Sequence, residues 1–148
     1  MNTVIDPVNE LSGVVGRFRR QLRRSVESGF DSARLTESQS ELLWLVGRQP
    51  GISISAAAAE LGLVANTAST LVSKLVAKGF LARTADESDR RVGQLWLAGP
   101  AQELVDTSRA ARRELLGEVL KDLTDDEIES LTKGLAVLET MTRRLQER

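Results

Sequence analysis

The sequence predicts a mainly α protein with a minor β part, built from six helices and one two-stranded hairpin. Apolar residues recur at intervals of three and four along most of the chain, which is the period of amphipathic helices. Helix-start signals punctuate this pattern, most clearly the capping boxes that begin at Thr36 and Thr124. Between Phe80 and Leu97 the pattern changes to short extended runs around a polar turn. The 148 residues, 41% of them hydrophobic, suit a single globular unit over 1–148.

The first helix is expected to begin after Asp6, a good N-cap residue, with Pro7 at the first helical position. Its apolar positions share one face: Val8, Leu11, Val15, Phe18, Leu22 and Val26. Gly29 suits the end of a helix, so we expect this element to occupy 5–30.

Two shorter helices follow. The second starts at the capping box Thr36–Gln39 and ends before Pro50. Ser53 or Ser55 can cap the third, which is rich in alanine and is closed by Gly62.

A fourth helix is expected from about Ala65 to Lys78, ending at Gly79. Its inward face carries four apolar residues, namely Ala68, Leu71, Val72 and Leu75. Only a short turn separates it from the third helix, which is the arrangement of a helix-turn-helix.

The hairpin is predicted from two short runs, Phe80–Thr84 and Val92–Leu97, with a long polar tip over 85–90. We expect Trp96 to pack inside this small sheet. A helix-turn-helix followed directly by a β-hairpin, the wing, makes a winged helix, here over 36–97.

Two long amphipathic helices complete the chain over 100–146, one after Gly99-Pro100 and one from the capping box Thr124–Glu127. The first helix has no partner of its own inside a compact lobe. Three long amphipathic helices from both ends of the chain therefore favour the core of a dimer.

Composition excludes several classes of site. The chain has no Cys and no His, which removes disulfides, thiolate nucleophiles, cysteine sensing, the usual zinc site and a histidine general base. The acids Asp125, Asp126 and Glu127 fit a helix N-terminus better than a catalytic pair. We expect no enzyme, no metal and no cofactor. No apolar run is long enough to span a membrane and no export signal is visible, so the expected location is the cytoplasm.

The sequence resembles the MarR family of bacterial transcription regulators. The stretch from Gly51 to Leu97 follows the family pattern without gaps. The matching positions are Leu61-Gly62, Leu71 to Leu75, Lys78 to Leu81, Arg83, and Asp89 to Arg91. Where the family usually has Ser-Pro before the recognition helix, this chain has Val64-Ala65, which leaves Asn66 as the candidate for the missing cap.

The resemblance implies a homodimeric, sequence-specific regulator of transcription that binds a pseudo-palindromic double-stranded operator. We interpret it as a repressor released by a small-molecule effector. The helices over 5–30 and 100–146 would form the dimer interface, and 36–97 would bind DNA. A winged-helix module for protein–protein contact is the alternative, because this fold does not by itself imply DNA.

The fourth helix carries the candidate base contacts on the side opposite its apolar face: Asn66, Thr67, Ser69, Thr70 and Ser73. Asn can pair with adenine through two hydrogen bonds, and a Thr methyl can contact the methyl group of thymine. The plainer interpretation is that these residues only solvate an exposed helix.

Contacts to the DNA backbone and the minor groove are expected elsewhere. Lys74, Lys78 and Arg83 are candidates for phosphate contacts, which position a protein without specifying sequence. The resemblance places Arg90 and Arg91 in the wing, with Asp89 orienting the arginines. Arginine suits the negative potential of a narrow minor groove, although an exposed turn can also simply be charged.

The net charge of −1 makes no case for nucleic acid, but its distribution does not oppose it. The region 52–97 has five basic and four acidic residues, whereas 98–148 has eight basic and eleven acidic residues. The acidic excess thus falls in the expected dimerisation helices, and salt screens it from the DNA face.

Two further features have alternative interpretations. The five arginines between Arg17 and Arg24 can pair with the C-terminal helices, line a cavity for an acidic ligand, or simply be solvated. Phe18, Phe30 and Trp44 can border the pocket in which, by the resemblance, a small anionic or phenolic effector binds. Trp44 can equally be an ordinary core residue.

Overall fold

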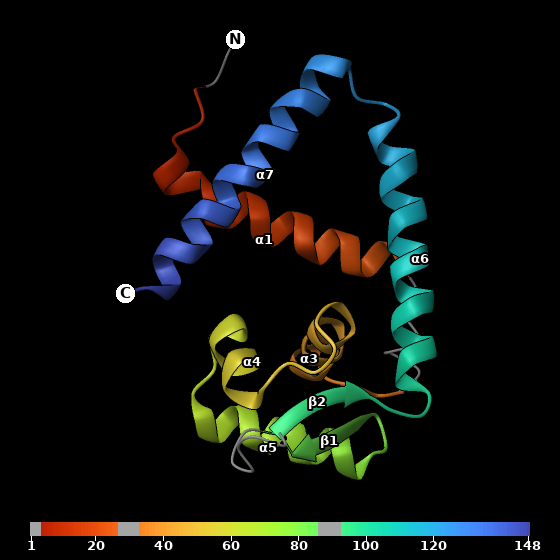
Figure 1. The fold of residues 1–148 in the computed structure, drawn as a ribbon. Helices are drawn as coiled ribbons and strands as arrows, with labels where there is room; N and C mark the ends of the chain where they lie inside the picture. Colours follow the sequence, from red (N-terminus) through yellow and green to blue (C-terminus); the bar gives the residue numbers. More distant parts are fainter. Residues whose placement is uncertain (1–3, 27–32, 86–92) are drawn as a thin grey trace.

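The computed structural model describes residues 4–26, 33–85 and 93–148 (Figure 1). Within these ranges the chain forms six helices and one two-stranded antiparallel sheet, which confirms the predicted fold class. The elements in chain order are α1 (Pro7–Ser25), α3 (Glu37–Arg48), α4 (Ile54–Leu61), α5 (Ala65–Ala77), β1 (Leu81–Ala85), β2 (Gly93–Leu97), α6 (Ala101–Leu120) and α7 (Asp125–Gln146).

The molecule has two parts. A winged-helix lobe contains α3, α4, α5, β1 and β2, and the three long helices α1, α6 and α7 rise from it and cross above it (Figure 1). The core lies in the lobe around α3, where Leu42, Leu43, Leu45 and Val46 are all buried.

Helix starts follow the predicted capping chemistry. Asp6 accepts a hydrogen bond from the backbone N–H of Val8, and the capping boxes at Thr36 and Thr124 are both complete. Ser53, rather than Ser55, caps α4, because its hydroxyl oxygen accepts from the N–H of Ala56.

Two boundaries differ from the prediction. The helix α1 ends at Ser25, earlier than Gly29, because the next residue, Val26, is extended and its side chain is buried. Asn66 does not cap α5, since Val64 occupies the N-cap position without a side-chain hydrogen bond. Asn66 is therefore the second residue of α5 and lies in its first turn.

The sheet pairs β1 with β2 from Leu81–Leu97 at the base to Ala85–Gly93 toward the tip. Leu81 and Leu95 point into the core and are fully buried. The prediction that Trp96 packs inside the sheet was wrong: its side chain is 39% exposed, because it alternates with Leu95 and faces away from the core. Its Nε1 donates to Thr84 Oγ1 at 2.8 Å.

The long helices contact the lobe mainly through the start of α6. Ala101, Val105 and Ser108 are buried there, whereas α1 and α7 contain no buried residue. No helix in the described part of the chain is both long and apolar enough to cross a membrane.

Candidate nucleic-acid interface and ligand cavity

The helix α5 presents two distinct faces. Ala68, Val72 and Leu75 are buried against the lobe, and Leu71 is half-buried. The five residues predicted to contact bases are all exposed, and they are Asn66, Thr67, Ser69, Thr70 and Ser73. The fold therefore displays this polar face on the outside of the lobe.

The hydrogen bonding of this face leaves polar groups available. Thr70 Oγ1 donates to the backbone oxygen of Asn66 at 3.0 Å, so its hydroxyl proton is already used within the helix. Thr70 can then offer an oxygen lone pair and a methyl group to a partner. Because Asn66 does not cap the helix, its amide donors and acceptor are not used as an N-cap.

The basic residues lie near this face. Lys74 is exposed on α5, and Lys78 is exposed at its C-cap. Arg83 is exposed on β1, and its guanidinium lies across the place that a Cβ on Gly93 would occupy. Asp89, Arg90 and Arg91 lie outside the described residues.

A cavity of about 700 Å³ separates α1 from the lobe and is bounded on one side by α6. Trp44 lines this cavity, whereas Phe18 does not line it and is 57% exposed. Phe30 lies outside the described residues. The arginines of the lining are Arg19, Arg23, Arg48, Arg109 and Arg112. They outnumber the three lining glutamates, so the cavity favours an anion.

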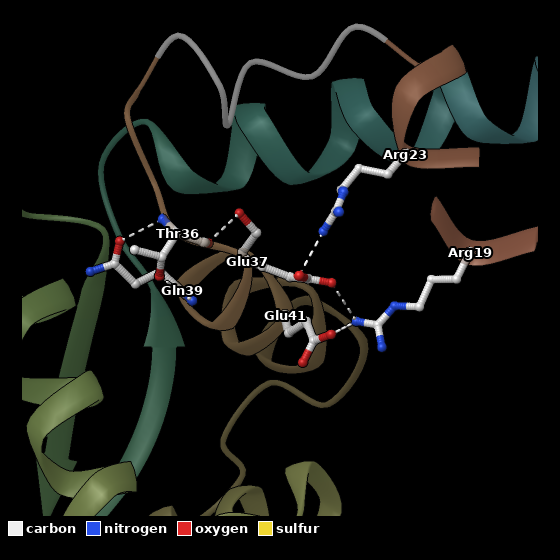
Figure 2. A network of polar contacts seen from close by, with 7 residues as sticks. Arg19, Arg23, Thr36, Glu37, Gln39 and Glu41 are labelled. Atoms are coloured by element: carbon white, nitrogen blue, oxygen red, sulfur yellow. Dashed lines mark hydrogen bonds and ion pairs between the residues drawn. The ribbon is translucent and has the colours of Figure 1, made fainter. Parts of the chain in front are cut away.

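Ion pairs join α1 to α3 at one side of this cavity (Figure 2). Arg23 Nη1 lies 2.7 Å from Glu37 Oε2, and Arg19 Nη2 lies 3.5 Å from Glu37 Oε1. Arg19 also pairs with Glu41. The hydrogen bond from Arg23 holds the pKa of the Glu37 carboxyl below its ordinary value, and the charge of Arg19 lowers it further. Within the described part of this chain, both arginines thus form ion pairs with α3.

The α6 side of the cavity contains residues that the sequence pattern did not predict as site residues. The guanidinium carbon of Arg112 lies 4.5 Å from the ring centroid of Trp44, a cation–π distance. Burial lowers the pKa of Arg112, and the positive charge of Arg19 lowers it further. Ser108 Oγ is buried and has no hydrogen-bond partner among the described residues. The spacing of Ser108 and Arg112 at i and i+4 could have placed them on one helix face.

Known proteins share this arrangement. A model described as the MarR family matches residues 35–92. No curated protein matches the sequence. Among solved structures, FabT of Streptococcus pneumoniae in complex with DNA has a TM-score of 0.79 at 21% identity, covering 95% of this chain and 99% of FabT.

Two further solved structures are similar. The transcriptional regulator SlyA has a TM-score of 0.74 at 20% identity and covers 97% of this chain and 98% of SlyA. A DNA complex of MepR from S. aureus has a TM-score of 0.68 at 19% identity, with 88% and 96% covered. At these identities the likeness shows a shared winged-helix fold. The MarR family model therefore matches the winged-helix lobe, and the fold of these solved structures extends over nearly the whole chain.

Proposed function

We propose that this protein is a homodimeric, sequence-specific DNA-binding regulator, and that it represses transcription until a small anionic or phenolic effector releases it. The observation that carries the proposal is the exposed polar face of α5, opposite the buried Ala68, Val72 and Leu75. A helix held in this way can enter a major groove about 12 Å wide, as recognition helices do.

The chemistry of this face supports base contacts. Asn66 offers the amide pattern that pairs with adenine, and Thr70 offers a methyl group and an acceptor. Lys74 and Lys78 flank it with positive charge that can meet phosphates. FabT and MepR, which share the fold, are both seen in complexes with DNA.

Apolar surface on the long helices supports a homodimer. Val15 and Phe18 on α1 and Leu131, Leu135 and Leu145 on α7 are each more than a third exposed. Surface of this kind on helices that bury nothing in their own chain fits a two-fold interface between copies. Two α5 helices related in this way would meet successive major grooves of a pseudo-palindromic site.

The cavity supports an effector. Its volume of about 700 Å³ lies in the range of small-molecule sites, and its arginines favour an acidic ligand. It lies between the lobe and the long helices, so a ligand with different affinity for two arrangements of these parts would shift the balance between them.

The experiment that tests the proposal replaces Asn66 and Thr70 with Ala and measures binding to DNA from the protein's own upstream region by fluorescence anisotropy. We expect the double variant to lose about 1–3 kcal/mol per lost base contact while remaining folded and dimeric. Thr107→Ala, an exposed threonine on α6, is the matched control and should bind as the wild type does. Unchanged affinity of the double variant would instead favour a winged helix used for protein–protein contact.

A further inference from the structure

Gly93 is a glycine that the backbone does not require. Gly51, Gly62, Gly79 and Gly99 have positive φ values, which favour glycine, and Gly93 does not. It stands in β2, where a glycine weakens the strand because it loses more conformational freedom on folding and has no side chain to pack. A glycine at such a position indicates that another group approaches the strand closely.

The group that approaches Gly93 is the guanidinium of Arg83. A Cβ on Gly93 would lie 3.1 Å from both Cζ and Nη2 of Arg83 and would overlap with its Nε. Arg83 pairs with Leu95 and Gly93 pairs with Ala85, so the arginine side chain reaches diagonally across the sheet to the start of β2. Gly93 is buried, whereas Arg83 is exposed. We call this arrangement of Arg83 on Gly93 the arginine seat.

The arginine seat lies on the side of the wing that meets the lobe. Successive side chains of a strand point to opposite faces, and Arg83 shares its face with Leu81 and Leu95. Both leucines belong to the core, and β1 packs against α5. The positive charge of Arg83 is therefore carried on the face toward α5, and not on the outer face where Trp96 lies.

The strand β2 cannot easily yield to an added side chain at Gly93. On the edge that faces away from β1, the N–H of Gly51 donates to the backbone oxygen of Leu95 at 2.8 Å, and the N–H of Leu95 donates to the backbone oxygen of Ile52 at 2.9 Å. The strand is thus hydrogen-bonded along both edges. A methyl group on Gly93 would displace the flexible side chain of Arg83 and leave the strand in place.

The guanidinium of Arg83 is suited to an anion from outside the chain. No ion pair joins it to a carboxylate in the parts of the chain that the structure describes. Its planar group can donate two parallel hydrogen bonds to one phosphate. A long side chain that must first be ordered on binding reduces affinity, and a side chain that is already ordered avoids this cost.

We propose that Gly93 is a positioning residue for DNA binding: it allows Arg83 to rest against β2, so that the guanidinium meets a DNA phosphate in an ordered position. This inference rests on the proposed function and adds the residue that orients one of its phosphate contacts. Gly93 acts only through Arg83. Any side chain at this position lifts the guanidinium off the strand and leaves it to be ordered during binding.

The first experiment measures the arginine seat without DNA. Nitrogen NMR relaxation follows the Nε–Hε group of Arg83 in the wild type and in Gly93→Ala, and Arg83→Lys assigns the signal. We expect the order parameter of Arg83 to be clearly above that of the exposed Arg148 in the wild type, and to fall to the level of Arg148 in Gly93→Ala. An Arg83 as mobile as Arg148 in the wild type overturns the proposal, as does one equally restrained in both proteins.

The second experiment measures affinity for DNA from the protein's own upstream region at several salt concentrations. It compares the wild type, Gly93→Ala, Arg83→Ala and the double variant. We expect Gly93→Ala to weaken binding about three- to tenfold, and to add nothing when Arg83 is already absent. Arg83→Ala should make the slope of log affinity against log salt shallower by about 0.9, the value of one lost phosphate contact.

Gly117→Ala is the matched control, because it adds the same methyl group to α6 with nothing within 4 Å, and it should bind DNA as the wild type does. An equal loss from Gly93→Ala with and without Arg83 contradicts the proposal, since the methyl group would then act on the wing itself. Unchanged affinity of Gly93→Ala contradicts it too. If the wild type binds no DNA, the proposed function fails, while the NMR comparison still decides whether Gly93 seats Arg83.

Discussion

Gly47 lies where α6 crosses α3, and its missing side chain allows the two helices to approach. A Cβ at this position would lie 2.8 Å from Val105 Cγ1, well inside the ordinary contact distance of about 3.5–4.0 Å. Val105 is fully buried and cannot move into solvent. The absence of a side chain at Gly47 thus helps to set how α6 packs against α3, and so how the long helices extend from the lobe.

We predict that Gly47→Ala destabilises the protein. Alanine is the better helix former and should stabilise the fold by roughly 0.5–1 kcal/mol, whereas overpacking against Val105 should cost about 1–3 kcal/mol. The net effect should therefore be a lower free energy of unfolding. Chemical denaturation measures the difference. Gly117→Ala on α6 is the matched control, because nothing lies within 4 Å of its added Cβ, and it should be neutral or stabilising. Equal effects of the two substitutions would show that the crossing is not tightly packed.

The stability of the fold should depend on pH through the carboxyl of Glu37. Its pKa is lowered from 4.5 by the hydrogen bond from Arg23, so its ionised form is favoured in the folded state. Such a group stabilises the fold above its unfolded pKa, and the contribution disappears as the pH falls through the lowered folded value. We expect Glu37→Gln to lower the denaturation midpoint at neutral pH and to leave it unchanged in strong acid. A difference that persists in acid would mean that the effect is not due to this charge.

At the scale of elements, four of the six described helices begin with a side-chain cap, and these are α1, α3, α4 and α7. In α3, Thr36 Oγ1 accepts from the N–H of Gln39 at 3.2 Å, and Gln39 Oε1 accepts from the N–H of Thr36 at 3.0 Å. Gln39 is itself buried, so this capping box joins the start of the helix to the core.

We predict that Thr36→Ala destabilises the protein by about 1 kcal/mol, since it leaves the backbone N–H of Gln39 without its side-chain partner. Thr36→Ser keeps the hydroxyl and should lose much less. Thermal denaturation of both variants checks the prediction, and an equal loss in the two would point to packing of the threonine methyl instead.

These local devices explain what the sequence could predict. Capping boxes, proline and glycine positions and apolar periods act over a few residues, so the helices and the exposed face around Asn66 could be placed correctly. Trp96 was misplaced because a two-residue period does not say which face of a short hairpin meets the core. The cavity residues Ser108 and Arg112 meet α1 and α3 only through tertiary folding. Their spacing alone could not reveal those partners.

At the scale of the whole molecule, a single chain leaves its long helices incompletely covered. On α7, Leu131 is 42%, Leu135 54% and Leu145 69% exposed. A second copy is the partner that the proposed function requires.

We predict that Leu135→Glu weakens dimerisation by at least about tenfold, because it would place a charge in an apolar interface. Lys133→Gln, which changes an exposed residue of the same helix, should leave dimerisation unchanged. Sedimentation over a range of concentrations measures both. A dimer unaffected by Leu135→Glu would exclude this face of α7 from the interface.

In the proposed function, the protein binds DNA as a dimer through α5. The most direct test is to let the purified protein select fragments of its own genome and to sequence them. We expect strong enrichment of a short pseudo-palindromic site whose half-sites lie about 34–36 Å apart, one helical turn. We also expect the double variant of Asn66 and Thr70 to lose this enrichment. Recovery of unrelated fragments, or of the same site by that variant, would contradict it.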